Sequence, residues 1–410
     1  MHDENYIRLS RFKVIFLASC VGVIVASMFY IQPIEKLLVT SLATTPQVVS
    51  VIAMLVQVSY ALGLLLVVPL GDSHNRYHFL QLVELLSVIS LLTAALSPNV
   101  IVFGIASVAI GLTSVGGQII IPYVAYLTPV KHQGPVLGAM ISGMLTGILL
   151  ARTFSGIIAQ QWGWQMVYLI AAVINLIFLI SIHFLVPDDP RQVTRPKKYL
   201  QVIKSLPGLV RKYRYLRGSA VNAFCLFALA NLFWSTLSFL LADRFGYGSA
   251  AAGSMGLLGI VSIIAAPMIG RMASTYSPQS NIKLSWLLAA IAYLVFTLFT
   301  RSIIVMMIGI ILLDLSTQFS QVTNQAIIQS LSREANSRNN SVFMFAYFFG
   351  GSIGTLVGIN VWAMSNWQGV AIAAVFFLLL AVINYYWQGV PKVLGSETEK
   401  NISKQSADAE

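Results

Sequence analysis

Charged residues are scarce in this chain of 410 residues, and that scarcity is the first constraint on what the protein can be. Asp, Glu, Lys and Arg together make up 10% of the sequence, whereas about a quarter of a soluble globular protein is charged. Too few charged side chains are present to cover a water-soluble surface. A cytosolic enzyme and a disordered protein are therefore disfavoured, and so is a nucleic-acid-binding protein in spite of the net charge of +11.

Cysteine is also rare. Cys20 and Cys225 both lie in apolar runs, so they provide neither a disulfide framework nor the spacing of metal ligands. The sequence contains no nucleotide-binding loop, no cluster of metal ligands and no arrangement of a nucleophile with a base. We therefore expect a protein that is not an enzyme and that uses no cofactor and no metal.

Long apolar runs are abundant. Hydrophobic residues make up 57% of the chain, and a helix needs about 20 mainly apolar residues to cross a membrane. The polar start of the chain leads directly into a full-length span, which is expected to be a retained helix and not a signal peptide. The fold expected is an all-α membrane protein with twelve transmembrane helices, at residues 13–34, 48–70, 79–97, 100–126, 135–159, 165–186, 218–242, 250–273, 282–301, 303–329, 340–363 and 367–389.

The distribution of Lys and Arg predicts the orientation of the spans. With twelve spans, both ends of the chain lie on one side of the membrane, and all but four of the 25 Lys and Arg residues fall on that side. The exceptions are Lys36, Arg244 and Arg301 on the other side and Arg152 within a span. Because cytoplasmic loops are enriched in Lys and Arg, we expect both termini to be cytoplasmic, in the inner or plasma membrane of the cell.

A polar stretch divides the spans into two sets of six. We expect an N-terminal six-helix half at 1–186, a linker at 187–217, a C-terminal half at 218–391 and a disordered cytoplasmic tail at 392–410. The linker carries nine Lys and Arg residues. It could bind anionic lipid headgroups at the inner leaflet. The favoured interpretation is a connector that follows the excess of positive charge in cytoplasmic loops.

The two halves repeat one another at an offset of 203 residues, and spans four to six resemble spans ten to twelve in order and in sidedness. Two pseudo-symmetric six-helix bundles, related by an axis along the membrane normal, are typical of one large class of transporters, whose substrate site lies between the halves near the middle of the membrane. The matched residues are Gln118 with Gln321, Gly147 with Gly350, Trp164 with Trp367 and Gln165 with Gln368, while Ala151 and Ser155 align with Gly354 and Gly358.

Asp314 is the leading candidate for a functional residue. It lies about 16 Å along its span at helical rise, close to the middle of the membrane, where a charge is costly and usually functional. Gln318, Gln321 and Gln325 follow at helical spacing and form a polar stripe that must line a water-filled cavity or face other helices. We expect Asp314 to take up and release a proton and the amides to bind substrate. A structural pair between Asp314 and Arg152 is the alternative.

Arg152 and Glu84 are the other charges clearly within spans. Arg152 lies among small residues, which let helices approach closely. It is expected to clamp a substrate carboxylate, to act as counter-ion of Asp314 or to bond to backbone carbonyls. Glu84 lies little more than one turn inside its span, so a structural pair with a loop residue such as Arg76 at the inner interface is preferred over proton coupling. Glu35 lies near the outer end of the first span, where it can reach water.

Further polar and aromatic residues are placed to line a cavity. Gln118 in span four mirrors the stripe of span ten, and Asn324 flanks that stripe. Asn231 and Trp234 lie in span seven, and Tyr30 lies in span one. We expect these groups to contribute to a substrate site.

The loop between spans two and three resembles the signature of the major facilitator superfamily, G-x-L-A-D-R-x-G-R-[RK]. Residues 68–77 keep its aspartate and its second arginine as Asp72 and Arg76. The resemblance implies the major facilitator fold, and it implies a gating role for Asp72 and Arg76 at the inner side of the outward-open state. The departures from the signature are Val68, Ser73 and Asn75.

Span five resembles the exporter motif G-x-x-x-G-P-x-x-G-G. Gly147 and Gly156 match it, and Arg152 takes the position of the proline. The chain is similar to bacterial sugar- or drug-efflux-like permeases of that superfamily. Ser107 stands where drug exporters tend to carry an arginine, which separates this chain from their usual proton coupling.

The sequence therefore predicts a secondary active transporter that moves a small organic molecule by alternating access, with proton-coupled efflux as the preferred mode. A proton-coupled importer of a small metabolite would use the same residues, and a channel-like facilitator would need no coupling carboxylate. A non-transporting membrane sensor or scaffold would need a partner surface that the sequence does not show. The expected partners are a small organic substrate, protons and membrane lipids but no nucleic acid, and we expect a monomer.

Overall fold

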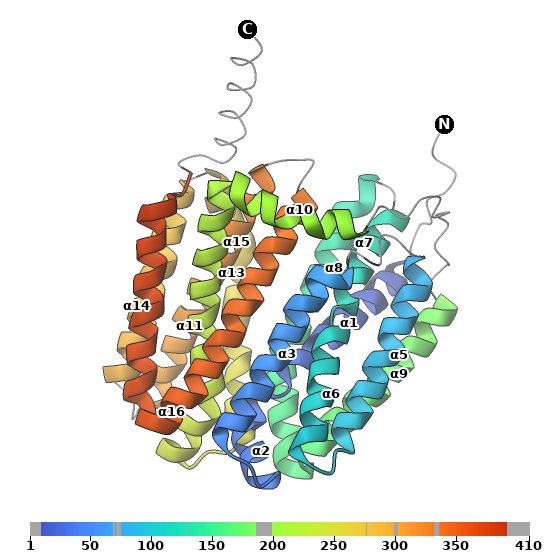
Figure 1. The fold of residues 1–410 in the computed structure, drawn as a ribbon. Coiled ribbons are helices and arrows are strands. Elements are labelled where there is room, and N and C mark those ends of the chain that lie inside the picture. The colour runs from blue at the N-terminus through green and yellow to red at the C-terminus, as the bar shows by residue number, and fades with distance from the viewer. Residues whose placement is uncertain are drawn as a thin grey trace, which may run out of the picture. The chain divides into compact units, whose positions relative to one another are not determined.

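The chain is helical throughout the part that we describe. The computed structural model describes residues 10–68, 70, 75–128, 130–185, 199–275, 277–298, 302–331 and 336–391, and within these ranges it has no β-strand. The helices, labelled as in Figure 1, are α1 (Arg11–Ala26), α2 (Glu35–Ser41), α3 (Pro46–Leu66), α5 (Arg76–Ala95), α6 (Val100–Thr113), α7 (Gly116–Leu127), α8 (Val130–Trp162), α9 (Trp164–Leu185), α10 (Tyr199–Lys212), α11 (Arg214–Phe245), α12 (Ser249–Ser254), α13 (Ile260–Thr275), α14 (Pro278–Leu298), α15 (Ile303–Leu331) and α16 (Asn336–Gln388). Three short 3₁₀ segments, η1 (Ser27–Phe29), η2 (Gln32–Ile34) and η3 (Met255–Gly259), interrupt or extend them.

The described residues contain 11 helical stretches that are long and apolar enough to cross a membrane. The last of them, α16, consists of two helices that meet at a kink, because Ser365 and Asn366 have non-helical backbone angles. The predicted spans 340–363 and 367–389 are these two helices. The all-α fold predicted from the sequence is therefore confirmed.

Short polar residues begin several of the helices. The Asn75 side chain accepts a hydrogen bond from the backbone N–H of His78 at the start of α5. Asn99 accepts bonds from the N–H groups of Ile101 and Val102 at the start of α6. Such caps satisfy N–H groups that have no partner within the helix, so the loop sequences fix where these spans start.

Two compact units make up the structure. The first comprises Met1–Tyr199 and Leu237–Leu257, and the second comprises Leu200–Thr236 and Leu258–Glu410. The C-terminal part of α11 and all of α12 thus belong to the first unit. The predicted domain boundaries, which assign each half a continuous stretch of chain, remain a prediction.

Small residues join two helices of the first unit. A Cβ atom added to Gly143 of α8 would collide with the backbone of Ala18 in α1, and one added to Gly147 would collide with the backbone of Gly22. Glycine is therefore required at both positions for α1 and α8 to approach this closely.

The second unit repeats this arrangement. A Cβ atom on Gly350 of α16 would collide with the backbone of Phe224 in α11, and one on Gly354 would collide with the backbone of Ala228. Gly350 is the residue that the sequence repeat aligns with Gly147. The repeat thus reflects equivalent helix packing within each unit.

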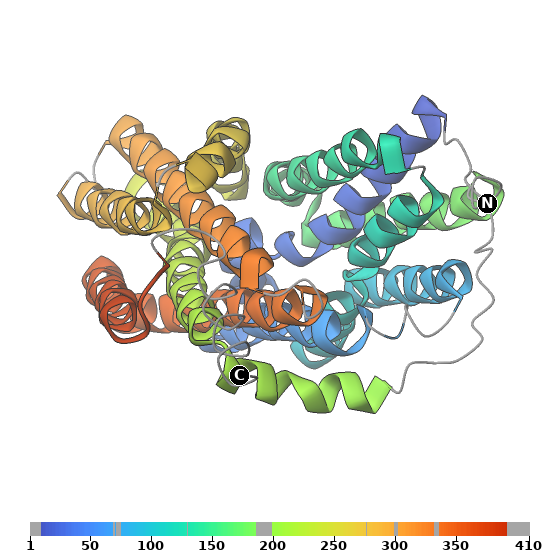
Figure 2. The same ribbon diagram turned by 90° about the horizontal axis from the view of Figure 1, so that it is seen from above.

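The predicted linker contains an amphipathic helix. In α10, Leu206 and Leu209 are buried, whereas Lys204, Arg211 and Lys212 are exposed. The Arg217 guanidinium donates to the carbonyls of Val210 and Arg211, each at 2.8 Å, and so satisfies the end of the helix. Viewed from above, α10 runs across the picture, unlike the spans of the second unit (Figure 2). Residues 199–212 of the predicted linker therefore form a helix that the sequence analysis did not foresee.

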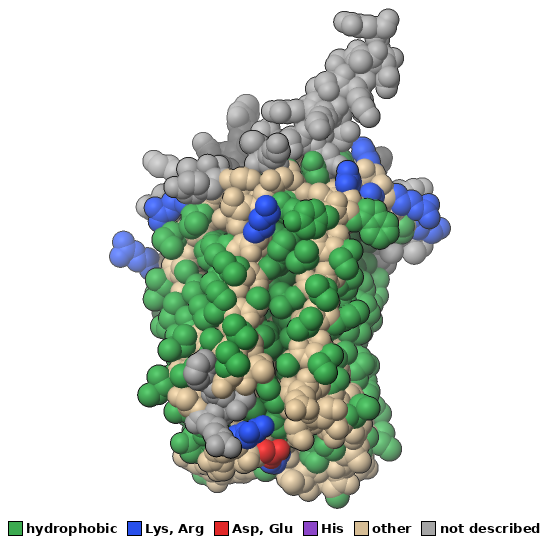
Figure 3. All heavy atoms as spheres, turned by 90° about the vertical axis from the view of Figure 1, so that its left-hand side faces the viewer, with side chains coloured by type: hydrophobic (Ala, Val, Ile, Leu, Met, Phe, Trp, Pro, Cys, Tyr) green, Lys and Arg blue, Asp and Glu red, His purple; other side chains and the backbone are tan. Residues whose placement is uncertain are grey.

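One face of the molecule shows the surface expected of a membrane protein. Apolar side chains cover its middle, and Lys and Arg are found towards its ends (Figure 3). In the second unit, Leu287, Leu294 and Ile372 are 56%, 56% and 72% exposed. In water such a surface would drive aggregation, whereas acyl chains cover it without cost.

Candidate functional site

Asp314 lies half-buried in α15 of the second unit. The indole nitrogen of Trp234, a buried residue of α11, donates a hydrogen bond to its Oδ1 at 3.3 Å. A hydrogen bond to a charged group is stronger than one between neutral groups. The two residues that the sequence singled out separately are therefore joined in the structure, and they form the centre of what we call the Asp314 cluster.

The predicted stripe of amides on α15 is partly exposed along its length. Gln318, Gln321 and Gln325 are all half-buried. The hydroxyl of Tyr347 donates to Oε1 of Gln321 at 3.3 Å, and Nε2 of Gln325 donates to Oδ1 of Asn340 at 3.5 Å. We include the three glutamines in the Asp314 cluster, because their amide groups are partly exposed on the same helix face as the carboxylate.

Two asparagines of the prediction have other roles. Nδ2 of Asn231, a buried side chain, donates to the carbonyl of Phe227 in its own helix at 3.0 Å. Asn324 is also buried, and its Nδ2 donates to the carbonyl of Ser320 at 2.8 Å. Asn324 thus flanks the half-buried stripe of amides on its buried side, in the packed interior of the second unit.

Tyr347 and Phe227 form an aromatic wall beside the amides, which the sequence analysis missed. Their rings stack with centroids 3.9 Å apart and planes 16° apart. Stacked aromatic rings give a rigid apolar surface, here next to the hydrogen-bonding group of Gln321. The aromatic-rich sequence of this span was visible, but the partner on α11 depends on tertiary packing.

Arg152 is the centre of a second polar cluster, in the first unit, that we call the Arg152 cluster. Its Nε donates to Oε1 of Gln32 at 2.8 Å, and its guanidinium carbon lies 5.2 Å from the ring centroid of Phe29. Gln32 is buried and Arg152 is half-buried. The guanidinium is therefore held by an amide and by an aromatic ring, an arrangement of hydrogen bond and cation–π contact that is typical of arginine.

The helix of the first span breaks where it meets Arg152. After α1 the chain forms η1 and η2, with Pro33 inside η2. The carbonyl of Tyr30 accepts a hydrogen bond from Oγ of Ser155 at 2.5 Å. The ring of Tyr30 lies edge-on to that of Tyr168, with centroids 6.4 Å apart. Tyr30, predicted to line a cavity, thus belongs to the Arg152 cluster together with Ser155 of α8.

Glu35 was expected to reach water at the end of the first span, and this is wrong. Its side chain is 0% exposed, and neither carboxylate oxygen has a hydrogen-bond partner. It follows Pro33 and Gln32 at the start of α2 and interacts electrostatically with Tyr168. A buried carboxyl group so close to Arg152's partner Gln32 makes Glu35 a second ionisable candidate in the Arg152 cluster.

Glu84 does not extend to the membrane interface, so the predicted pairing with Arg76 is wrong. Glu84 of α5 is 0% exposed, and both carboxylate oxygens are buried without a hydrogen-bond partner. Its Oε2 lies beside Gly116 of α7. Glu84 therefore remains a candidate on burial alone and belongs to neither cluster.

Gln118 links three helices of the first unit. Its Nε2 donates to the hydroxyl of Tyr60 in α3 at 3.4 Å and to the sulfur of Met144 in α8 at 3.3 Å. Its repeat partner Gln321 also has a tyrosine as hydrogen-bond partner, which is Tyr347 of α16 in the second unit. Both glutamines of the repeat are thus held by a phenol, and both stay partly exposed.

Of the two predicted gating residues, Asp72 lies outside the described residues. Arg76 begins α5, and one of its guanidinium nitrogens donates to the carbonyl of Pro122 in α7 at 3.1 Å. Arg76 therefore ties the start of the third span to the kinked end of the fourth.

Among the described residues, no group of three or more His, Cys, Asp or Glu side chains could hold a metal ion. The two clusters instead offer one guanidinium, buried and half-buried carboxyl groups, amides and aromatic faces. Such groups bind a small polar or amphipathic molecule by hydrogen bonds and stacking, and their carboxyl groups can exchange a proton.

Comparisons with known proteins identify the family. The sequence profile of the Major Facilitator Superfamily matches residues 15–355. The chain is 29% identical over 382 residues to the uncharacterized transporter YgaY of Escherichia coli O157:H7, covering 93% of this chain and 96% of that protein.

Solved structures show the same fold. A bacterial homologue of the human lysosomal transporter Spinster, in an inward-facing and occupied conformation, superposes with a TM-score of 0.76 at 13% identity, covering 92% of this chain and 96% of the other. A D-xylose–proton symporter gives a TM-score of 0.70 at 14% identity, covering 94% and 99%. The protein is therefore a multi-pass membrane transporter and not an enzyme, and the chain belongs to the major facilitator superfamily.

Proposed function

We propose that this protein is a proton-coupled secondary transporter that exports a small organic molecule by alternating access. The single observation that carries the proposal is the half-buried carboxylate of Asp314, bonded to Trp234 on a helix face lined with amides. A carboxylate at mid-span is costly unless function retains it.

The two clusters suggest the chemistry of the substrate. Gln321 and the stacked pair Tyr347 and Phe227 suit a flat or ring-shaped molecule with hydrogen-bonding groups. Arg152 suits a carboxylate or another electron-rich group, because a guanidinium binds such groups with two donors. We propose a small molecule that combines a ring with polar or acidic substituents. The pair between Arg152 and Asp314 that the sequence allows stays a prediction.

We further propose that the termini are cytoplasmic, in the inner or plasma membrane, because Lys and Arg collect on that side. In this orientation Arg76 acts at the cytoplasmic end of the spans and gates together with Asp72. We also propose that the protein acts as a monomer with membrane lipids around it. The exposed Lys204, Arg211 and Lys212 of α10 are suited to anionic headgroups at the inner leaflet.

Import by proton symport is the second candidate. The fold matches that of a D-xylose–proton symporter, so the same architecture serves inward transport in another protein. Export is preferred here because span five resembles an exporter motif through Gly147 and Gly156, both of which pack against backbone in the first unit. The coupling carboxylate would be shared by both mechanisms.

The test uses the full chain in inside-out vesicles with an imposed pH gradient. Proton movement is followed with an interior pH-sensitive dye while a panel of labelled sugars, aromatic acids and cationic dyes is added one at a time. Export predicts uptake of a compound into these vesicles that is driven by proton efflux, and loss of coupled proton movement in Asp314→Asn. Asp243→Asn is the matched control, since Asp243 is an exposed partner of Lys36.

Two results would count against the proposal. Full gradient-driven transport by Asp314→Asn would remove this residue from coupling. Accumulation by right-side-out vesicles under an inward proton gradient would replace export by import.

A further inference from the structure

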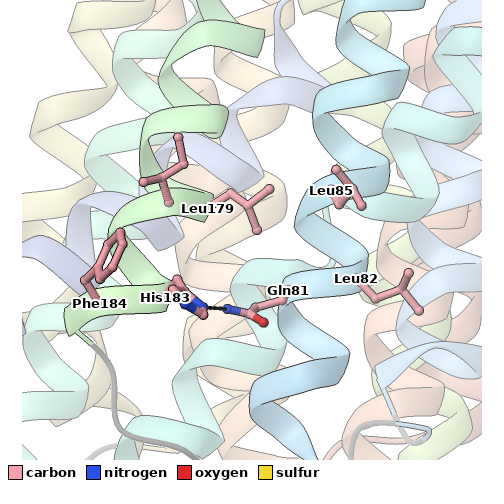
Figure 4. Close-up of a pocket in the computed structure, with 7 residues that line it drawn as sticks. Gln81, Leu82, Leu85, Leu179, His183 and Phe184 are labelled. Atoms are coloured by element: carbon pink, nitrogen blue, oxygen red, sulfur yellow. Dashed lines mark hydrogen bonds between the residues drawn. The ribbon is translucent and has the colours of Figure 1, made fainter.

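A groove on the surface of the first unit lies between α5 and α9 and includes none of the residues of the Arg152 cluster. It has a volume of about 490 Å³. Figure 4 shows Gln81 and His183 meeting across it, with Leu179 and Leu85 farther along the same two helices. The residues that matter for its chemistry are Gln81, Leu82, Leu85, Leu179, Ile180 and His183.

One end of the groove is polar, and its hydrogen bonds engage Nδ1 of His183. Nε2 of Gln81 donates to the hydroxyl of Tyr77 at 3.0 Å and contacts Nδ1 of His183 at 3.2 Å. The Tyr77 hydroxyl lies 3.3 Å from the same Nδ1 and 3.3 Å from the carbonyl of His183. Since an amide nitrogen can only donate, Nδ1 of His183 accepts in the contact with Gln81, and an imidazole that accepts at Nδ1 donates through Nε2. The exposed side chain of His183 therefore offers an N–H donor to an outside ligand.

The rest of the groove is apolar and open. Leu82, Leu85 and Ile180 are 52%, 45% and 51% exposed. Gln81 lies in the second turn of α5, which begins at Arg76, and His183 lies in the last turn of α9, which ends at Leu185. The polar groups are thus at the ends of two membrane-spanning helices, at headgroup depth, and Leu85 and Leu179 lie about one turn deeper.

A second groove of the first unit provides the internal comparison. It lies between α3 and α6, has a volume of about 460 Å³ and is lined by apolar residues such as Val48, Val51 and Ile101, with Gln47 as its polar side chain. It holds no histidine among its lining residues. Two grooves of nearly equal size therefore differ in the polar group at the end, which is the imidazole of His183 beside Gln81 in one and the amide of Gln47 in the other.

We propose that the groove between α5 and α9 is a binding site for one membrane phospholipid. The phosphodiester oxygen of the headgroup accepts a hydrogen bond from Nε2–H of His183, and an acyl chain lies along Leu82, Leu85 and Ile180. A bond from a neutral N–H to an anionic oxygen is charge-assisted and stronger than a neutral one. From the membrane surface inward, the groove presents first the His183 donor and then its apolar residues. A phospholipid has its phosphate and its acyl chains in the same order.

The test reconstitutes the full chain with phosphatidylglycerol that carries a diazirine in one acyl chain. Diacylglycerol with the same photoreactive chain is the comparison, because it lacks the phosphate. After illumination, labelled peptides from α5 and α9 and from α3 and α6 are quantified by mass spectrometry. We expect phosphatidylglycerol to label the α5 and α9 peptides about tenfold more than diacylglycerol, the ratio that a charge-assisted hydrogen bond provides. The α3 and α6 peptides should be labelled equally by both lipids.

Variants assign the effect to His183. His183→Ala should reduce the preference for phosphatidylglycerol to about that of the α3–α6 groove. His183→Leu suits a membrane-facing position and provides the same test if His183→Ala does not fold. Gln47→Ala in the other groove is the control and should change nothing at α5 and α9.

Three outcomes would overturn the proposal. They are equal labelling of the α5 and α9 peptides by both lipids in the unmodified protein, a preference that survives in His183→Leu, and suppression of phosphatidylglycerol labelling by millimolar inorganic phosphate. The last result would assign the donor to free phosphate and not to a lipid.

Discussion

Gly163 and Asn366 occupy equivalent turns of the two sequence repeats. They are separated by the repeat offset of 203 residues, each directly precedes a tryptophan, and both have positive φ, 88° and 52°. In each unit the residue reverses the chain between two spans. The repeat therefore includes a backbone conformation as well as side chains, and the second copy achieves it without glycine.

The turn at Asn366 predicts a stabilising substitution. Positive φ strains most residues but not glycine, and Asn366 has ψ of −141°, a combination that glycine adopts most readily. We expect Asn366→Gly to raise the free energy of unfolding by about 1 kcal/mol, and Gly163→Ala to lower it by a similar amount. Thermal unfolding of the purified protein in detergent measures both. A loss of stability in Asn366→Gly, or a gain of stability in Gly163→Ala, would contradict the interpretation of the turn.

The glycines that join helices predict a second set of effects. Gly147→Val and Gly350→Val each place a side chain against the backbone of a neighbouring helix, so we expect both to reduce the yield of folded protein several-fold. Gly138 is the matched control on the same helix as Gly147, because a Cβ there meets nothing within 4 Å.

Size-exclusion profiles and the amount of protein in the membrane provide the measurement. Normal folding of Gly147→Val would show that α1 and α8 can separate, and a defect in Gly138→Val would show that any bulk on α8 is harmful.

The fold could be predicted largely from the sequence, because a membrane imposes length and apolarity on every span. The same constraint singled out Asp314 in the interior of its span, and in the structure this residue is half-buried in α15. Trp234 and Asp314 were both singled out, but their hydrogen bond depends on how α11 and α15 pack, and a single sequence carries no signal for that pairing.

Depth along a helix was a poorer guide to burial. Glu84 lies about two turns into α5, and a flexible side chain there was expected to reach the interface, yet Gly116 and Cys20 enclose it from neighbouring helices. Glu35 was misjudged for the same reason, because the break at Pro33 directs it inward. Which face of a helix is buried depends on the neighbouring helices, and the sequence leaves their identity open.

Trp234→Phe tests the indole bond to Asp314. The variant keeps an aromatic ring and removes only the N–H donor, so the hydrogen bond is lost with little change in packing. We expect coupled transport to weaken about tenfold, the effect of one hydrogen bond to a charged group. Trp286→Phe is the control, because this half-buried indole donates the equivalent bond to Asn222 and not to a carboxylate. Equal losses in both variants would mean that the effect is structural and not specific to Asp314.

Glu84→Leu tests whether the buried carboxyl group is a cost to the fold. Because neither oxygen has a hydrogen-bond partner, a leucine of similar size loses no bond, and we expect stability to rise by about 1–3 kcal/mol. The midpoint of thermal unfolding measures the change. Transport driven by a proton gradient should persist, since coupling is assigned to Asp314. A fall in stability would show that Glu84 has a partner in the folded protein, and loss of transport in a stabilised variant would place Glu84 in the coupling mechanism.

Arg152→Lys tests whether the shape of the guanidinium matters, as well as its charge. Lysine keeps the charge, but one ammonium cannot both bond to Gln32 and lie flat against Phe29 as the guanidinium does. We therefore expect Arg152→Lys to lose about tenfold in transport at low substrate concentration. Arg244→Lys makes the same exchange at an exposed position of α11 and should have no effect.

A double-mutant cycle separates the role of Gln32 from that of the substrate. If Gln32 orients the guanidinium, Gln32→Ala alone should weaken transport, and it should add little to the loss already caused by Arg152→Lys, because residues in contact are not additive. Fully additive losses would mean that the two side chains act independently and that Gln32 binds substrate itself. Unchanged transport in Arg152→Lys would mean that Arg152 contributes only its positive charge to transport. The hydrogen bond to Gln32 would then serve the fold and not substrate binding.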